Sequence, residues 1–312
     1  MKDFRITALA GGIGAARFLE GLIRVIEPRN LTVIVNTADD LQLYGLHISP
    51  DIDIVMYTLA GVVNPKTGWG FRKDRFFCLK ELGKLHGEDW FRLGDRDLAT
   101  HIYRSWLLRR GWSLTEITDT LRKRFSLQCR ILPMSDDPVC TRMATDQGTF
   151  HFQEYLVKRK AQDRVRKVHF QGIQRAQASL PVLQAIERAD GIIICPSNPI
   201  VSIGPILRLP GLRPLLRKRR GKILAISPIV GGKPVKGPAA QIMTGLGMEV
   251  SARQVAWLYR DIVKVFILDR QDLALAPEIE SLGLRVVVMD TIMKDLKAKV
   301  RLARVAYEAL RY

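Results

Sequence analysis

The chain has 312 residues, of which 47% are hydrophobic, and it carries a net charge of +18 from 49 basic and 31 acidic residues. This length and composition are typical of one large globular domain, or of a domain with an inserted lobe, and no low-complexity tract is present. The sequence contains neither an apolar run of about 20 residues nor a signal peptide, so we expect no membrane segment and no secretion.

The first predicted elements are a strand over residues 6–10, a glycine turn, a helix and a second strand over residues 31–35. This order is typical of the first half of a nucleotide-binding α/β domain. Gly11, Gly12 and Gly14 let the backbone approach a phosphate, and the helix that follows presents unpaired N–H groups to it. The spacing lacks the third glycine of the dinucleotide fingerprint and a P-loop lysine, so a tight turn without a ligand stays open.

Four carboxylates follow the second strand. Asp39, Asp40, Asp51 and Asp53 fall in two predicted loop segments, ahead of a short helix predicted over residues 54–61. Loops after parallel strands gather at the edge that carries the glycine turn, where carboxylates can hold Mg²⁺ against a diphosphate. The same carboxylates are alternatively solvated turn residues or helix caps.

The next stretch is rich in aromatic and basic residues. Trp69, in a turn-rich loop over residues 64–76, either stacks on a flat ligand or wedges the loop onto the core. Arg92 precedes a helix predicted to begin near residue 98, and it is a candidate clamp for an anion or a polar ring edge. We interpret His101, one turn into that helix, as a packed or capping residue rather than a catalyst.

Residues 66–175 are predicted to form a mixed, largely helical lobe inserted into an α/β core made of residues 1–65 and 176–312. The lobe contains a strand predicted over residues 128–132 and a hairpin over residues 141–152, whose turn is Asp-Gln-Gly. The whole chain is therefore interpreted as a single α/β unit.

The alternation of strands and helices returns in the C-terminal half. One predicted strand ends just before Ser197 and Asn198, and another leads into a loop that contains Gly231 and Gly232. Small polar side chains and glycine backbone in such loops can face a nucleobase or a phosphate. Together with the first glycine turn, these loops would form one site at the sheet edge. The predicted fold is a Rossmann-like, mostly parallel sheet with helices on both faces.

Cysteine usage and charge bear on location and partners. The four cysteines are widely separated and form no C-x-x-C pair, which indicates a reducing, cytoplasmic location. The basic residues occur in short scattered groups without a recognisable nucleic-acid module, so we expect no nucleic-acid partner. A phosphorylated, anionic substrate fits the charge equally well. Because parallel-sheet enzymes of this size are commonly dimers, we also expect a homodimer.

Blocks of sequence in order from about residue 5 to 245 resemble the 2-phospho-L-lactate transferase family (CofD/FbiA-like), which acts in the biosynthesis of the deazaflavin coenzyme F420. These blocks are GGIGAARFLEGL, VNTADD, GLHISPDIDIVMYTLAG, FRLGDRDLATHIYR, ILPMSDDPVCT, CPSNPIVSIGPIL and ISPIVGGKPVKGPAA. A non-catalytic nucleotide-binding regulator of the gluconeogenesis-factor type is the alternative, since that family shares the glycine turn and the Asp-Asp loop. The segments at residues 48–53 and 93–97 favour the transferase.

The resemblance implies a specific reaction. A phospholactyl or phosphoenolpyruvyl group moves from a guanosine diphosphate donor to the terminal ribityl hydroxyl of Fo, 7,8-didemethyl-8-hydroxy-5-deazariboflavin. GMP leaves, and Mg²⁺ is required. The sequence does not distinguish the two three-carbon acids. A third interpretation, an NAD-dependent oxidoreductase, is disfavoured because the second strand ends at Val35-Asn36 without a ribose-binding acid.

The family's motifs also imply roles for individual residues. By analogy with these motifs we choose Asp39 and Asp51 as the Mg²⁺ ligands, with Asp40 as an alternative ligand. Asp51 and Asp53 are the implied catalytic pair, and Asp53 is the candidate base for the hydroxyl proton. The remaining implied contacts are Asp53, Arg92 and Trp69 with Fo, and Gly11, Gly12, Gly14, Asn36, Ser197, Asn198, Gly231 and Gly232 with the nucleotide.

Overall fold

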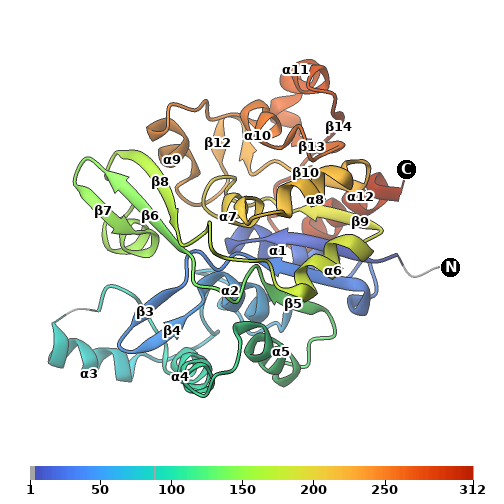
Figure 1. Ribbon diagram of the computed structural model, residues 1–312. Helices are drawn as coiled ribbons and strands as arrows, with labels where there is room; N and C mark the ends of the chain where they lie inside the picture. The colour runs from blue at the N-terminus through green and yellow to red at the C-terminus, as the bar shows by residue number, and fades with distance from the viewer. Residues whose placement is uncertain (1–3, 88, 312) are drawn as a thin grey trace.

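A parallel sheet forms the centre of the computed structural model, which describes residues 4–87 and 89–311. Within the described chain its strand order is β14-β13-β10-β9-β1-β2-β5, and neighbouring strands pair in parallel (Figure 1). The strands are β1 (Ile6–Ala10), β2 (Leu31–Val35), β5 (Arg130–Pro133), β9 (Gly191–Ile194), β10 (Ile223–Ile226), β13 (Val265–Asp269) and β14 (Arg285–Met289). The predicted Rossmann-like α/β fold is confirmed.

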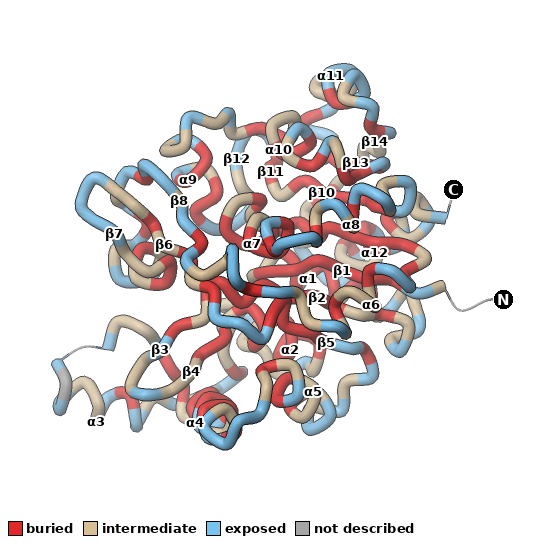
Figure 2. The backbone as a smooth tube through the Cα atoms, viewed as in Figure 1, coloured by how far each residue is buried: buried red, intermediate tan, exposed pale blue. Residues whose placement is uncertain are grey.

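Helices cover both faces of this sheet, so its inner strands are buried along almost their whole length (Figure 2). One face carries α1 (Gly12–Leu22), α2 (Pro50–Leu59), α5 (Leu114–Arg124) and α12 (Leu296–Arg311). The other carries α6 (Leu180–Arg188), α7 (Ile203–Arg208), α8 (Leu212–Lys218), α10 (Ala252–Tyr259) and α11 (Ala276–Ser281). Along β1, Ala8 packs into the first core and Leu9 into the second, as the two-residue period of a strand requires.

The order of the strands reverses at β1. From β1 the chain first adds β2 and β5 on one side, and it later adds β9, β10, β13 and β14 on the other. The helices that follow the adjacent strands β1 and β9, namely α1 and α7, lie on opposite faces. The loops at the carboxyl ends of these two strands therefore diverge and leave a crevice, which is where open α/β sheets bind ligands.

Smaller elements flank this edge of the sheet (Figure 1). On one side lie the hairpin β3 (Leu41–Leu43) and β4 (Leu46–Ile48), with α3 (Phe77–His86) and α4 (Asp95–Arg109). On the other lie β6 (Cys140–Thr145), β7 (Gly148–His151), a π-helical turn (Glu154–Lys158) and β8 (Val165–Gln171), with β11 (Ile229–Val230), β12 (Lys233–Pro234) and α9 (Ala239–Gly245) nearby. The predicted hairpin over residues 141–152 is confirmed.

Two predictions about local structure were wrong. Asp51 and Asp53 do not lie in a loop, because α2 begins at Pro50, whose fixed φ angle suits the first turn of a helix. The strand predicted over residues 128–132 exists as β5, but it was wrongly placed in the lobe. It pairs with β2 in the central sheet, and Leu132 and Ile131 pack into the cores on the two faces of that sheet. The boundaries of the inserted lobe stay a prediction. No helix within the described residues combines the length and apolar character needed to cross a membrane.

Candidate functional site

A cavity of about 630 Å³ opens at the carboxyl ends of the central strands. Its walls come from the glycine turn after β1, the loop after β2, the first turns of α2 and α4, and the loops after β9, β10 and β14. Phe152, Gln153, Leu156 and Val157, beside the three-stranded sheet, line another side. The crevice predicted from the strand order is therefore a cavity large enough for an extended ligand.

The glycine turn brings backbone close to this cavity. Gly12 has a backbone φ of +70°, which residues other than glycine rarely adopt. Its N–H donates to Asp51 Oδ1 at 2.9 Å. A Cβ atom at Gly14 would collide with the carbonyl oxygen of Pro196 in the loop after β9. Because three of the four residues of this turn lack a side chain, the backbone at the N-terminus of α1 lies close to the cavity, which suits an anionic ligand.

Two buried carboxylates, Asp39 and Asp51, share one neutral donor beside this turn. Asn36 Nδ2 donates to Asp39 Oδ2 and to Asp51 Oδ2, both at 3.0 Å, and Asn36 Oδ1 accepts the N–H of Ala38, which fixes the orientation of the amide. Burial, and then the charge of Asp51, hold the pKa of Asp39 well above its usual range. Burial raises the pKa of Asp51 to about 6, against the opposing hydrogen bonds from Asn36 and Gly12. Among the described residues, no basic side chain forms an ion pair with either carboxylate.

The chemistry of this pair suits a divalent cation. Asp39 Oδ1 is buried without a hydrogen-bond partner. In the part of the chain that the structure describes, no group of three or more His, Cys, Asp or Glu side chains could hold a metal. Mg²⁺ commonly binds through one or two carboxylates and takes its other ligands from water and substrate phosphates, so the two carboxylates fit it. The alternative ligand Asp40 is engaged elsewhere, with Ser49 Oγ at 2.7 Å and His47 Nε2 at 2.9 Å.

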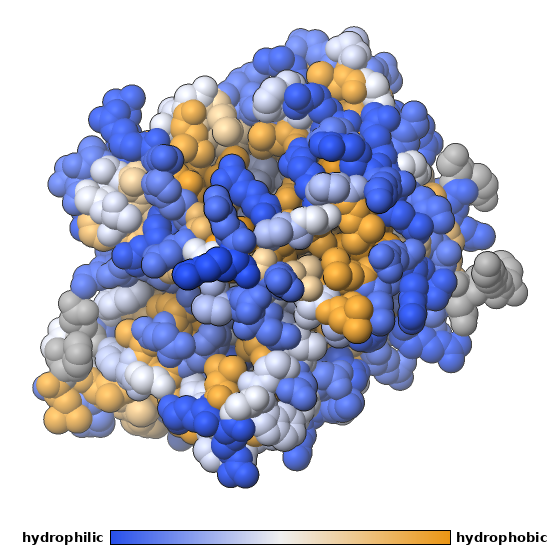
Figure 3. Space-filling view, in the orientation of Figure 1, coloured by the Kyte–Doolittle hydropathy of each residue, from blue (hydrophilic) through white to orange (hydrophobic). Residues whose placement is uncertain are grey.

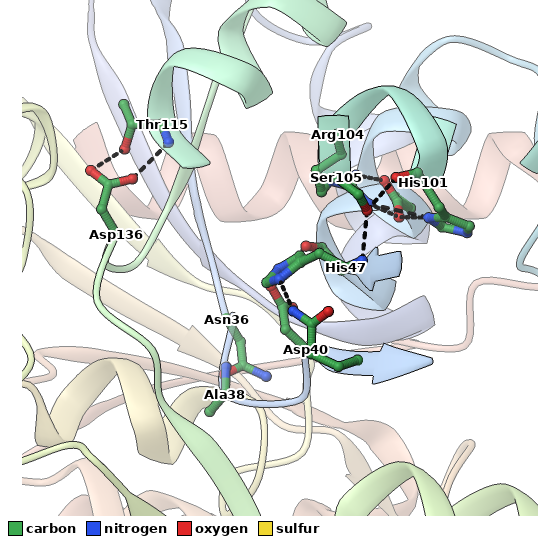
Figure 4. Close-up of polar contacts among 12 residues, drawn as sticks. Asn36, Ala38, Asp40, His47, His101, Arg104, Ser105, Thr115 and Asp136 are labelled. Carbon is green, nitrogen blue, oxygen red and sulfur yellow. Dashed lines mark hydrogen bonds and ion pairs between the residues drawn. The ribbon is translucent and has the colours of Figure 1, made fainter. Parts of the chain in front are cut away.

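A second polar cluster joins α2 to α4. Arg104 is fully buried and binds both carboxylate oxygens of Asp53, with Nη1 at 3.0 Å from Oδ2 and Nη2 on Oδ1. His101 projects from the same helix (Figure 4), with Nδ1 at 3.7 Å from Asp53 Oδ2 and Nε2 at 3.3 Å from Asp97 Oδ1. Tyr57 donates to Asp97 at 2.8 Å. Burial raises the pKa of Asp53, while Arg104 and His101 oppose that shift.

Most of the residues predicted from the sequence meet in this cavity. Its lining includes Gly11, Gly12, Gly14, Asp39, Asp51, Asp53, Trp69, Arg92, Ser197 and Asn198. Asn36 lies behind the lining, fully buried, and holds both carboxylates. Among the described residues, Gly231 and Gly232 do not line the cavity. The N–H of Gly231 instead donates to Asp272 Oδ1, with 3.1 Å between the nitrogen and the oxygen. Residues 235–239, later in the same loop, line the cavity instead.

Several residues of the site were not predicted as functional. They are Arg17, Asp97, His101, Arg104, Phe152, Gln153, Leu156, Val157 and residues 291–294. The spacing of Asp97, His101 and Arg104 places three ionisable groups on one helix face, which is a signal present in the sequence. No pattern in residues 152–157 indicates that some of them would line the same cavity as the distant glycine turn.

Comparison with known proteins identifies the family. The model of 2-phospho-L-lactate transferase CofD matches residues 6–306. The 2-phospho-L-lactate transferase of Methanosarcina mazei is 42% identical over 300 residues, which cover 96% of this chain and 98% of that protein. The phosphoenolpyruvate transferase of Kitasatospora aureofaciens is 42% identical over 310 residues, covering 97% and 96%.

The solved structures add support for the fold alone. A UPF0052-family protein from Bacillus halodurans matches the full length of both chains with a TM-score of 0.65 and 17% sequence identity. The family model and the two relatives cover nearly the whole chain at an identity that leaves no doubt about common descent. The chain belongs to the 2-phospho-L-lactate transferase family.

Proposed function

We propose that this protein transfers a phospholactyl or phosphoenolpyruvyl group from a guanosine diphosphate donor to the ribityl hydroxyl of Fo, releasing GMP, in coenzyme F420 biosynthesis. One observation carries the proposal: the glycine turn and the buried pair Asp39 and Asp51 line the same cavity as Asp53. The names of the two relatives differ in the three-carbon acid, so lactate and enolpyruvate remain the two candidates.

Binding of the donor would rest on the glycine turn and the carboxylate pair. The diphosphate would lie against the backbone between Gly11 and Gly14, at the N-terminus of α1. Asp39 and Asp51 would hold Mg²⁺, with Asn36 fixing the orientation of both carboxylates. A bound Mg²⁺ would supply positive charge to the phosphate oxygens as the transfer proceeds. Ser197 and Asn198, whose side-chain Oγ and Nδ2 atoms are buried without partners, are available to the guanosine half.

The acceptor, Fo, would bind in the part of the cavity next to α2, α4 and residues 152–157. Trp69, Trp90 and Leu156 make this part of the lining apolar and aromatic, which suits a flat tricyclic ring. Arg92 lies 4.7 Å from the ring centroid of Phe76 and also lines the cavity. These contacts would hold the ring while the ribityl chain reaches toward the donor.

Asp53 would accept the proton of the attacking hydroxyl. Arg104 holds both oxygens of its carboxylate, so the base keeps one orientation before substrate binds. The lone pairs that Arg104 leaves free on these oxygens can accept a further hydrogen bond. Phosphoryl transfer depends mainly on positioning and electrostatic stabilisation. A base held in one orientation helps to position the attacking hydroxyl.

The proposal is tested by turnover with Fo, Mg²⁺ and separately prepared lactyl and enolpyruvyl donors, with products identified by mass spectrometry. We expect one donor to give the phosphodiester and GMP. In the Asp53→Asn variant the rate should fall by about 10²–10⁴-fold, because the base is lost. The variant also leaves buried Arg104 without its counter-charge, so retained GDP binding is the control that shows the site is still folded. Failure of both donors, together with unchanged Fo fluorescence on titration with the protein, would instead favour a nucleotide-binding regulator.

A further inference from the structure

Charged side chains that line the cavity are separated by sign. The carboxylates come from the loop after β2, from α2 and from α4, and they are Asp39, Asp51, Asp53 and Asp97. Cations come from α1 and from the loops after β10 and β14, and they are Arg17, Lys236 and Lys294. Since β10 and β14 lie on the opposite side of β1 from β2, the two signs occupy different halves of the sheet edge. Arg92 is the one lining arginine on the acidic side within the described residues.

Arg17 extends the phosphate-binding turn. It lies three residues after Gly14 on α1, which is nearly one turn of helix, so its side chain can return to the face that carries the glycine turn. Its guanidinium donates to the carbonyl oxygen of Met293, in the loop that follows β14. That contact is to a neutral group, and the described residues include no carboxylate paired with Arg17.

Lys236 lies beside Arg17 and the glycine turn. Its Nζ donates to the carbonyl oxygen of Thr67 at 3.0 Å, and a Cβ atom at Gly68 would lie 3.5 Å from that Nζ and 3.1 Å from Ile13. Partial desolvation, and then the charge of Arg17, lower the pKa of Lys236, whose side chain is still largely exposed. Two cations therefore face one part of the cavity, and no carboxylate in the described chain is paired with either.

We propose that Arg17 and Lys236 bind the phosphate of the departing nucleoside monophosphate and stabilise the charge that it gains. This inference rests on the proposed function. The acceptor oxygen forms a bond to the phosphorus that carries the three-carbon acid, and the bond from that phosphorus to the bridging oxygen breaks. The electron pair stays on the bridging oxygen, which leaves with the nucleoside monophosphate, and the hydroxyl proton passes to Asp53.

The separation of charge fixes the direction in which the donor lies. Arg17 and Lys236 attract a phosphate that becomes more negative. On the other side, Arg104 neutralises Asp53, and a bound Mg²⁺ would neutralise Asp39 and Asp51. Cations aimed at the oxygen where charge develops lower the barrier to transfer, whereas cations distant from it affect binding alone. The nucleoside thus points toward β10 and β14, and the acceptor toward α2 and α4.

A purely structural role for Lys236 is the competing explanation. If Lys236 serves to tie the loop at residues 64–70 to the glycine turn, its loss should disturb the whole nucleotide site. Guanosine, which carries no phosphate, would then lose as much affinity as GMP. If Lys236 binds phosphate, guanosine should be unaffected. The comparison between these two ligands separates the explanations.

The test uses the full-length protein and Lys236→Met, with affinities for GMP, guanosine and inorganic diphosphate measured calorimetrically in Mg²⁺. We expect GMP to bind about 10-fold more weakly, guanosine to bind as before, and single-turnover transfer to slow by about 10²-fold or more. Lys236→Arg should recover most of the GMP affinity, since it restores the cation. Lys233→Met is the matched control from the same loop, because Lys233 is exposed and lies outside the lining, and it should change nothing.

Three results would overturn the inference: unchanged GMP affinity in Lys236→Met, an equal loss for guanosine and GMP, or a wild-type protein that binds neither GMP nor diphosphate. The binding measurements need no turnover. Absence of transfer with both donors would therefore count against the proposed function, while the ligand comparison would still decide the role of Lys236.

Discussion

Asn36 is a neutral side chain that holds two buried carboxylates in place. Its amide donates to Asp39 and Asp51, which are 2% and 7% exposed. One amide cannot neutralise two charges, and the pKa of each carboxyl is accordingly raised by burial. The folded protein thus keeps an electrostatic cost at this position, which a bound cation would remove.

A consequence of this cost is a measurable dependence of stability on pH. The pKa of Asp51 is about 6 in the folded protein against 3.8 ordinarily, so the folded state holds a proton that the unfolded state has released. The contribution of Asp51 to the free energy of unfolding should therefore fall by about 3 kcal/mol as the pH rises from about 4 to 6. Above about pH 6 this contribution should stay constant.

The measurement is urea unfolding between pH 4 and 7 without divalent cations, comparing the wild type with Asp51→Asn. The variant should lack this part of the decline, because it cannot ionise. Added Mg²⁺ should stabilise the wild type more at pH 7 than at pH 4. Identical pH profiles for the two proteins would contradict the assignment.

Part of this site could be predicted from residues alone. The glycine turn, Asp39, Asp51 and Asp53 are close in sequence to their strands and helix, and all line the cavity. The helical position of Asp51 and Asp53 was not predicted, although Pro50 before them is a helix-start signal. The partner of Asp53 could not be predicted in the same way, since Arg104 is 51 residues away and meets it through tertiary packing.

At the scale of elements, α2 and α4 are joined by a buried ion pair rather than by apolar contacts alone. Asp53 and Arg104 face each other with exposures of 4% and 0%. A buried pair often contributes little net stability compared with apolar residues, but removing one partner leaves an uncompensated charge. The pair is therefore better explained by its orientation of Asp53 toward the cavity than by stability.

We predict that Arg104→Met costs about 3–5 kcal/mol of stability and abolishes transfer, because Asp53 is left buried without its partner. The double variant Asp53→Leu with Arg104→Met should regain most of the stability and none of the activity. Denaturant unfolding and turnover assays check both. A single variant that loses less than about 1 kcal/mol would show that the pair is not buried as described.

The elements were predicted unevenly, and the reasons are physical. The hairpin over residues 141–152 has a turn signal and was predicted correctly. Strand β8 was missed because its central side chains are mostly polar and exposed, so its sequence has neither an apolar run nor clean alternation. Strand β5 was placed in the lobe because sequence order does not reveal that it pairs with β2.

At the scale of the whole molecule, the strand order determines where the site lies. The strand order reverses at β1, and two groups of smaller elements flank that edge of the sheet (Figure 1). Side chains from both groups line the cavity there. Hydrophilic side chains cover most of the surface seen in Figure 3, in keeping with the net charge of +18. The cavity itself has both signs of charge, so an anionic substrate would meet an ordered arrangement of charges rather than a uniformly basic surface.

The central claim is that Asp39 and Asp51 hold a divalent cation against a diphosphate at the glycine turn. Mn²⁺ bound in the presence of GDP, followed by electron paramagnetic resonance, tests it directly. We predict that Asp39→Asn and Asp51→Asn lose this binding, and that the neighbouring Asp40→Asn retains it because Asp40 is engaged by His47 and Ser49. Mn²⁺ binding that survives in Asp39→Asn, or that is lost in Asp40→Asn alone, would contradict the account.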